Sequence, residues 1–195
     1  MFSLKKDNYI LKPNIFSKLR IKFKVMSKIR MIYYSILGLN QGRDCKIGKI
    51  TCSWFSKIIL GDETEILDTV IFWFREPFNL NQYIQIGNRV YIGRNCEFNC
   101  NAKIIIDDDV LIGSNTIFVD ANHEYKKGLT INSQSVSSAD ISVGKDVWIG
   151  SNCTIMKGVS IGNGSIIAAG AVVNKSIPEN EIWGGVPAKK LKDRL

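Results

Sequence analysis

The single histidine of this 195-residue chain, His123, is the first candidate for chemistry. It lies in the segment Val119–Tyr125 (VDANHEY), and a polar, irregular stretch follows it as far as Ile141. A neutral imidazole can accept the proton of a hydroxyl group, which makes that hydroxyl a better nucleophile. A lone histidine is more often structural or simply exposed, so its role depends on the scaffold that carries it.

Other kinds of catalytic site have weaker support in the sequence. Without a second histidine, a serine triad has no spare base. Cys96 and Cys100 have CxxxC spacing, and no second cysteine pair follows them. The five cysteines are therefore better explained as small buried apolar residues than as zinc ligands or disulfides. We expect no metal.

A six-residue period sets the scaffold from residue 86 onward. Glycine usually follows the apolar residue of each hexad, and two residues later comes Asn, Asp or Gly, which tolerate tight corners and left-handed backbone conformations. The period shifts phase once and is interrupted by the stretch after His123. The apolar positions are Ile86, Ile92, Phe98, Ile104, Ile106, Ile112, Phe118, Val143, Ile149, Ile155, Ile161, Ile167 and Val173.

This period predicts an all-β solenoid of stacked coils. Each hexad corresponds to one short strand and one corner, and three hexads close a triangular coil. The stacked aliphatic residues fill the interior, because no single coil can bury its own face. Weaker hexads at Ile47–Gly48 and Leu60–Gly61 place the first coil near residue 44. The chain therefore divides into an N-terminal extension, residues 1–43, and a solenoid with a C-terminal tail, residues 44–195.

Three stretches resemble the hexapeptide-repeat acyltransferases, in particular the galactoside, maltose and polysaccharide O-acetyltransferases. They are Val147–Asn152 (VWIGSN), Ile161–Gly170 (IGNGSIIAAG) and Gly185–Lys189 (GVPAK). The resemblance covers about residues 44–195 and implies a left-handed parallel β-helix with an extruded loop. It also implies a homotrimer with active sites between subunits. The left hand is an exception to the usual right-handed crossover and follows from the resemblance alone.

The resemblance also implies roles for individual residues. His123 would be the general base at the start of the extruded loop, and Asn99 would reach the acceptor sugar. Trp148 directly precedes the apolar residue of its hexad, so we expect it to point outward. There it could stack on the sugar or on the cofactor arm, or be covered by the loop or by a trimer contact. The positions implied for acetyl-CoA are Ser151, Ala169, Asn174 and Lys175 at the pantetheine arm, Lys189 and Lys192 at the phosphates, and Trp148. Lysine stands where the family often has arginine, and it can bind phosphate as a point charge. The plainer alternative makes these positions ordinary hexad corners and solubilising lysines.

The function implied is acetyl-CoA-dependent O-acetylation of a saccharide hydroxyl, as in surface polysaccharide biosynthesis. The hydroxyl would attack the thioester directly, and a backbone amide or the indole of Trp148 would stabilise the oxyanion. An amino-sugar N-acetyltransferase is the enzymatic alternative. A non-enzymatic β-helix interaction module is the other; it would bind no CoA and would be unaffected by His123→Ala.

Residues 1–43 carry the excess positive charge of the chain. They hold ten Lys or Arg and one acidic residue, whereas residues 44–195 are nearly neutral, so the net charge of +8 does not predict a nucleic-acid-binding body. Apolar spacing predicts a helix over residues 14–37. The residues near helical spacing are Ile15, Leu19, Met26, Ile29, Tyr33 and Ile36.

Three interpretations of this helix stay open. A solenoid needs caps, so the helix could cover the open first coil. It could instead lie on anionic lipid, as a peripheral membrane contact through residues 1–43. Nucleic-acid binding is the least favoured. No signal peptide is visible, and the longest apolar run, Met31–Leu39, is too short to span a bilayer. We therefore expect a cytoplasmic protein, at the inner face of the membrane if the helix binds lipid.

Overall fold

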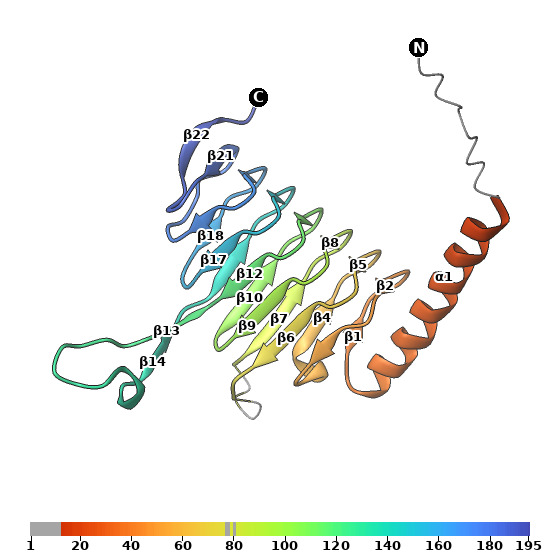
Figure 1. The fold of residues 1–195 in the computed structure, drawn as a ribbon, viewed down its shortest axis with the longest axis horizontal. Coiled ribbons are helices and arrows are strands. Elements are labelled where there is room, and N and C mark those ends of the chain that lie inside the picture. Colours follow the sequence, from red (N-terminus) through yellow and green to blue (C-terminus); the bar gives the residue numbers. More distant parts are fainter. Residues whose placement is uncertain (1–12, 77–78, 80) are drawn as a thin grey trace, which may run out of the picture.

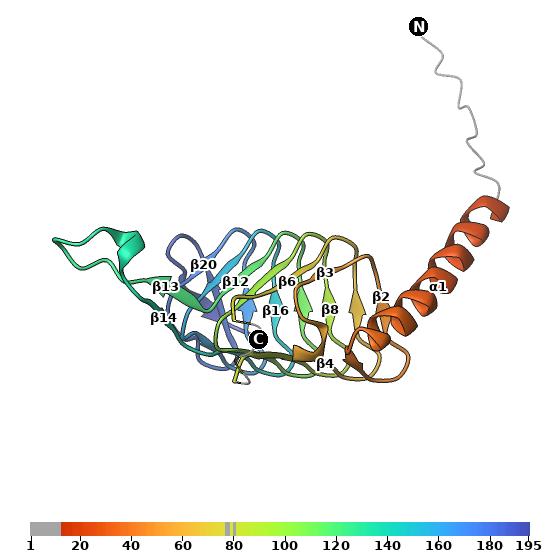
Figure 2. The same cartoon turned by 90° about the horizontal axis from the view of Figure 1, so that it is seen from below.

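The structure is a computed structural model that describes residues 13–195 apart from 77, 78 and 80, with side chains described from Val25 onward. After one helix, α1 (Pro13–Ile36), the chain winds through short strands that stack into three parallel sheets (Figures 1 and 2). Within the described residues no helix is long and apolar enough to cross a membrane.

Each coil contributes one strand to each sheet, which gives the molecule three flat sides. Sheet A contains β1 (Asn40–Gln41), β4 (Ile58–Leu60), β7 (Tyr83–Ile86), β10 (Lys103–Ile106), β15 (Ile141–Val143) and β18 (Ser160–Ile161). Sheet B contains β2 (Lys46–Ile47), β5 (Glu65–Ile66), β8 (Tyr91–Ile92), β11 (Leu111–Ile112), β16 (Trp148–Ile149), β19 (Ile166–Ile167), β21 (Glu181–Gly184) and β22 (Lys189–Asp193). Sheet C contains β3 (Thr51–Cys52), β6 (Ile71–Phe74), β9 (Glu97–Cys100), β12 (Ile117–Val119), β17 (Thr154–Met156) and β20 (Val172–Val173).

The hexad residues form the core, as the period predicts. Every apolar position of the repeat named above is at most 3% exposed. Three phenylalanines stack along the axis, with ring centroids 5.0 Å apart for Phe72 and Phe98 and 4.7 Å apart for Phe98 and Phe118. Each coil therefore buries its apolar face against the next coil, so stability depends on stacking.

The corners explain the other hexad positions. All eight Asn, Asp and Gly residues at the corner position have positive φ, namely Asn95, Asp109, Asn115, Asp146, Asn152, Gly158, Gly164 and Gly170. The glycine that follows the aliphatic residue has a different reason. A Cβ placed on Gly150 would lie 2.6 Å from the backbone nitrogen of Ala169 in the next coil, which is too close for any side chain. The corner predictions are confirmed.

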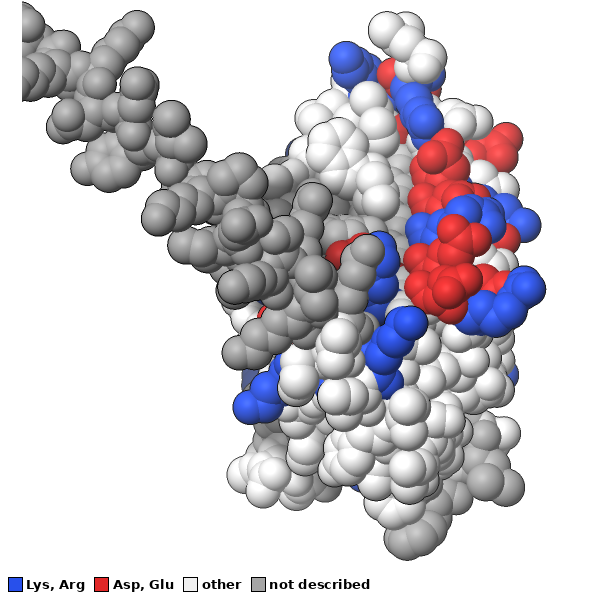
Figure 3. Space-filling view, turned by 90° about the vertical axis from the view of Figure 1, so that its right-hand side faces the viewer, with Lys and Arg blue, Asp and Glu red and all other residues white. Residues whose placement is uncertain are grey.

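Polar side chains also connect neighbouring coils. Asn95 donates from Nδ2 to Asn115 Oδ1 at 3.1 Å, and Asn115 donates likewise to Asn152 Oδ1 at 3.1 Å. Ion pairs such as Arg89–Asp109, at 2.6 Å, join other coils at the surface. Figure 3 shows acidic and basic side chains interleaved in one band on the face that it presents. This mixture of signs matches the nearly neutral charge of residues 44–195.

Three boundaries differ from the sequence-based expectations. The first strand of the β-helix begins at Asn40, slightly before the expected start at residue 44. The clear period starts only at residue 86, but β6 (Ile71–Phe74) already lies in sheet C in register with β9, so these residues belong to an earlier coil. The stretch after His123 is also more ordered than expected. It is a hairpin whose strands β13 (Ala121–His123) and β14 (Val136–Ser138) pair antiparallel.

Helix α1 packs on the first coil through residues other than those that defined its apolar spacing. Ser27 and Tyr34 are buried against the coil. By contrast, Met26, Ile29 and Tyr33 are 39–57% exposed and Ile36 is 78% exposed. The side chains of Ile15 and Leu19 lie outside the described residues. Apolar spacing thus located the helix, and the contact with the coil uses a different face from the apolar residues that defined the spacing.

Candidate active site

His123 is the last residue of β13, where the chain leaves the β-helix. Its side chain is exposed, and it stands opposite Val136 in the hairpin. The next residue, Glu124, donates its backbone N–H to Ser135 O at 2.9 Å. The antiparallel ladder therefore holds the backbone on both sides of the imidazole, while the ring itself stays accessible.

A buried carboxyl group anchors the foot of this hairpin. Asp120 is fully buried and accepts the backbone N–H groups of Asn101 and Ala102, each at 2.8 Å. Its own carbonyl accepts the N–H of Ala139 at 3.0 Å, which closes the other end of the hairpin. Burial raises the pKa of Asp120, and the donated N–H groups oppose that shift. The residue three positions before His123 thus fixes both the departure and the return of the chain.

A hollow of about 340 Å³ adjoins His123 and brings a lysine into the site. Its lining includes Asn122, His123, Ser137 and Lys157. Lys157 reaches it from the corner after β17 and donates from Nζ to Ser137 Oγ at 2.6 Å. The hollow therefore combines a base, a hydroxyl and a cation. Sequence reasoning missed Lys157 and Ser137, because contact between a corner and an extruded hairpin leaves no signal in hexad spacing.

Asn99 lies on the outer face of sheet C beside the same corner. The ladder aligns Trp73, Asn99, Val119 and Met156 on four successive coils, and Trp73 is 54% exposed. Asn99 O also accepts the N–H of Asp120 at 3.4 Å. The amide of Asn99 and the exposed indole of Trp73 therefore lie in one row, which ends at the foot of the hairpin. Asn99 was expected near the acceptor, whereas Trp73 was not singled out.

Asn174 and Lys175 belong to this corner as well. They follow β20, whose residue Val173 pairs with Ile155 of β17, so they continue the column of Met156 and Lys157 by one coil. Both side chains are exposed. The corner between sheets C and A thus gathers His123, Lys157, Asn174 and Lys175.

Ser151 and Ala169 lie at a different corner, between sheets B and C. They occupy equivalent places on neighbouring coils, where Gly170 donates its N–H to Ser151 O at 2.9 Å. Trp148 lies on sheet B just before this corner and is 55% exposed, so the expectation that it points outward is confirmed. Its neighbours in the ladder are Leu111, which is 50% exposed, and Ile166.

The lysines expected at the phosphates lie on β22, the outermost strand of sheet B. Lys190 is engaged in ion pairs with Glu181 and Asp193, both at 2.7 Å. Lys189 and Lys192 are exposed, and neither forms an ion pair with the described residues. The hydrogen bond and charge of Lys190 hold the pKa of Glu181 below its ordinary value. Lys190 therefore connects the two strands of this hairpin, whereas Lys189 and Lys192 are exposed to solvent and could bind a ligand.

The implied site residues thus form two sets within one chain. One set surrounds His123 at the corner between sheets C and A. The other set includes Ser151, Ala169 and Trp148 and lies at the corner between sheets B and C. Sheet C separates the two corners. A single protomer therefore presents His123, Asn174 and Lys175 on one edge and Ser151, Ala169 and Trp148 on another.

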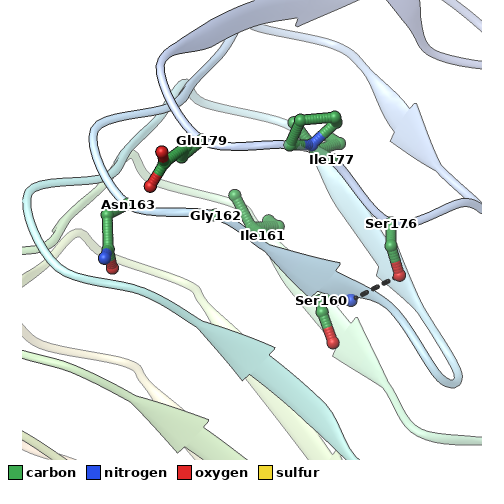
Figure 4. A pocket seen from close by; sticks show the side chains of 8 residues that line it. Ser160, Ile161, Gly162, Asn163, Ser176, Ile177 and Glu179 are labelled. Carbon is green, nitrogen blue, oxygen red and sulfur yellow. Dashed lines mark hydrogen bonds between the residues drawn. The ribbon is translucent and has the colours of Figure 1, made fainter.

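A second hollow, of about 510 Å³, contains none of the expected site residues. It lies between β18 and the segment Ser176–Glu179 (Figure 4). Ser160 donates its backbone N–H to Ser176 Oγ at 3.0 Å across it. The lining has serines and one carboxylate but no described base beside them, so it offers no comparable chemistry. No group of three or more potential metal ligands is found among the described residues.

Comparisons with known proteins agree with this architecture. Residues 140–175 match the family described as bacterial transferase hexapeptide (six repeats). This match agrees with the resemblance over those residues, and the fold is the left-handed parallel β-helix that the resemblance implied. AntD from Bacillus cereus, an N-acyltransferase solved with dTDP and 3-hydroxybutyryl-CoA, has the same fold, with a TM-score of 0.73 and 22% identity over 85% of this chain and 88% of that one.

Sequence relatives are named as acetyltransferases. The galactoside O-acetyltransferase of Escherichia coli is 37% identical over 127 residues, which cover 62% of this chain and 60% of that protein. A second relative from Escherichia coli, 33% identical over 63% of this chain and 60% of that protein, has lipopolysaccharide biosynthesis O-acetyl transfer in its name. The chain therefore spans about 60% of the length of these curated relatives.

Proposed function

We propose that the protein is an acetyltransferase that moves the acetyl group of acetyl-CoA to a hydroxyl of a saccharide. The observation that carries the proposal is the placement of His123. It is exposed, held by a hairpin ladder and anchored through the buried Asp120, on the scaffold of a hexapeptide-repeat protein. The names of the two Escherichia coli relatives support a sugar acceptor and surface polysaccharide as its source.

The proposed reaction needs one base and one bound thioester. An imidazole nitrogen of His123 takes the proton of the acceptor hydroxyl as its oxygen attacks the acetyl carbonyl. The new C–O bond forms, the C–S bond of the tetrahedral intermediate breaks, and the imidazolium returns the proton to the CoA thiolate. Lys157, in the same hollow, is suited to stabilise the oxyanion or to hold the acceptor. Ser151, Ala169, Asn174 and Lys175 would hold the pantetheine arm, and Lys189 and Lys192 the phosphates.

We further propose that the complete site forms between protomers of a homotrimer. In one chain sheet C lies between the His123 corner and the corner of Ser151 and Ala169. A second protomer could bring its own corner against the hairpin of the first. The exposed residues Leu111 and Trp148 on sheet B are apolar surface that such an assembly would cover. A cyclic trimer would use the same two edges in every contact.

CoA release in the presence of acceptors tests the proposal. Purified protein is mixed with acetyl-CoA and a panel of mono- and oligosaccharides, and free thiol is measured for the wild type, His123→Ala and the surface control Asp107→Ala. We expect release that requires a sugar, is unchanged in the control and falls about 10²- to 10⁴-fold in His123→Ala. Release that is equal in His123→Ala would refute the general-base role.

Product analysis separates oxygen from nitrogen as the acceptor atom. An acetyl ester is removed by mild alkali, whereas an acetamide is stable to it. An alkali-stable product made only from amino sugars would replace O-acetylation by N-acetylation. If no sugar supports release and CoA does not raise the melting temperature, the protein is an interaction module, because a bound ligand stabilises the folded state.

A further inference from the structure

The described half of helix α1 presents a row of apolar side chains to solvent. Most solvent-facing helix surfaces are polar, so a row of this kind needs a partner. The exposed fractions are 51% for Val25, 39% for Met26, 53% for Ile29, 65% for Ile32, 57% for Tyr33, 78% for Ile36 and 44% for Leu37 just after the helix. We call these seven residues the α1 stripe.

Polar anchors on the opposite face of the helix fix this orientation. Ser27 Oγ accepts the backbone N–H of Ile47 at 2.9 Å. The hydroxyl of Tyr34 accepts the N–H of Ile50 at 3.2 Å, and its ring stacks on Phe55 with centroids 4.9 Å apart. At 100° per residue, Ser27 and Tyr34 lie across the helix from Val25, Ile29, Ile32 and Ile36. The stripe therefore cannot turn inward without breaking these contacts.

The setting of the helix leaves the stripe accessible. In Figures 1 and 2 the C-terminal end of α1 meets the first coil, and the helix axis leads away from the β-helix toward its N-terminal end. Beside the stripe is an open hollow of about 480 Å³ lined by Lys28, Met31, Ile32, Ser35, Ile36 and Gln41. An exposed lysine thus borders apolar side chains at the edge of the stripe.

Charge decides between the candidate partners. Residues 1–43 contain ten Lys or Arg and one acidic residue, and no acidic residue lies within Pro13–Ile36. A second copy of so cationic a segment would be repelled. A bilayer with anionic lipid matches both features of this surface. Its negative head groups complement the cationic segment, and its apolar interior accepts the α1 stripe.

We propose that α1 is a peripheral membrane anchor that lies on anionic bilayers through the α1 stripe. Ile29, Ile32 and Ile36 enter the boundary between head groups and acyl chains, and Lys28 lies at the level of the lipid phosphates. The β-helix stays in water, attached through Ser27 and Tyr34. This proposal does not depend on the proposed reaction, because the stripe contains none of the site residues.

Vesicle flotation with the full-length protein tests the anchor. Vesicles contain either phosphatidylcholine alone or phosphatidylcholine with phosphatidylglycerol. The stripe variant is Ile29→Asp/Ile32→Asp. The charge-matched control is Leu129→Asp/Ile131→Asp, which changes two exposed apolar residues of the extruded hairpin, 62% and 58% exposed. Circular dichroism and the melting temperature verify that both variants are folded.

We expect the wild type and the control to float with phosphatidylglycerol vesicles and the stripe variant to bind at least about tenfold more weakly. Binding should weaken in high salt and on phosphatidylcholine alone. Equal flotation of the stripe variant, or no flotation of the wild type, would overturn the proposal. A change in sedimentation of the stripe variant without any vesicle binding would also overturn it and would assign the stripe to a second copy. CoA release with a soluble sugar should be the same in the stripe variant, so failure here leaves the proposed reaction intact.

Discussion

His123 and Asp120 divide the work of the site between an exposed and a buried side chain. A base must be accessible to its substrate, but an exposed side chain has few contacts of its own that fix its position. Here the order comes from Asp120, whose carboxyl group accepts N–H groups from the preceding coil at 2.8 Å. Asp120 is therefore a positioning residue in this account.

Replacing Asp120 by alanine should damage the hairpin more than the β-helix. The substitution leaves the N–H groups of Asn101 and Ala102 without their acceptor, which should cost about 2–3 kcal/mol in unfolding free energy. We expect kcat to fall more than KM for acetyl-CoA rises, because Ser151, Ala169, Lys189 and Lys192 lie away from the hairpin. Chemical denaturation and steady-state kinetics measure both effects.

Asp140→Ala is the matched control at the other foot of the hairpin. Asp140 is exposed and forms no hydrogen bond or ion pair within the described part of the chain. Its variant should keep wild-type stability and kinetics. If Asp140→Ala and Asp120→Ala behaved alike, the anchoring role of Asp120 would be wrong.

Two antiparallel hairpins carry candidate site residues that lie outside the regular hexads. The hairpin of β13 and β14 carries His123, and the hairpin of β21 and β22 carries Lys189 and Lys192. The second hairpin is held by Glu181, which accepts hydrogen bonds from Lys190 Nζ and Trp183 Nε1, both at 2.7 Å. Its order should therefore depend on the ionisation of Glu181.

Acid should loosen the C-terminal hairpin selectively. The pKa of Glu181 is lowered in the folded state, mainly by the hydrogen bond from Lys190. Its contribution is therefore present above the ordinary glutamate value of 4.5 and is lost as the pH falls through the lowered pKa. Amide hydrogen exchange in β22, corrected for the intrinsic pH dependence, should become a few-fold faster over that range.

Glu181→Gln should show the faster exchange already at neutral pH and should raise KM for acetyl-CoA without lowering kcat. In this variant the acid-dependent change in β22 should disappear. If amide exchange in β22 still became faster in acid in Glu181→Gln, a carboxyl group other than Glu181 would be responsible.

The regular elements were predictable because each obeys a local rule. Hexad spacing identified the buried residues from Ile86 to Val173, and residue type identified the left-handed corners such as Asn152. The rest depended on contacts that spacing does not encode. Lys157 lines the same hollow as His123 only because an extruded hairpin folds beside its corner. The face of α1 depended on two polar anchors, Ser27 and Tyr34, which an apolar period does not register.

For the whole molecule, the central feature is the division of the site between two corners. His123 stands at the corner between sheets C and A, and Ala169 stands at the corner between sheets B and C. The roles that the resemblance implies for His123 and Ala169 can both hold even though the two residues lie apart in one chain. We propose that another protomer completes the site, and this is the central claim of the account.

Complementation between two inactive variants tests this claim most directly. His123→Ala removes the base, and Ala169→Arg blocks the expected cofactor corner. The variants are purified separately, mixed after mild dissociation and reassembled, and CoA release is measured with an accepted sugar. Each variant alone should be inactive. Random reassembly should restore up to about a quarter of wild-type activity, since a mixed interface can combine an intact His123 with an intact Ala169 corner. No recovery, with subunit exchange verified by mass spectrometry, would contradict a site shared between protomers.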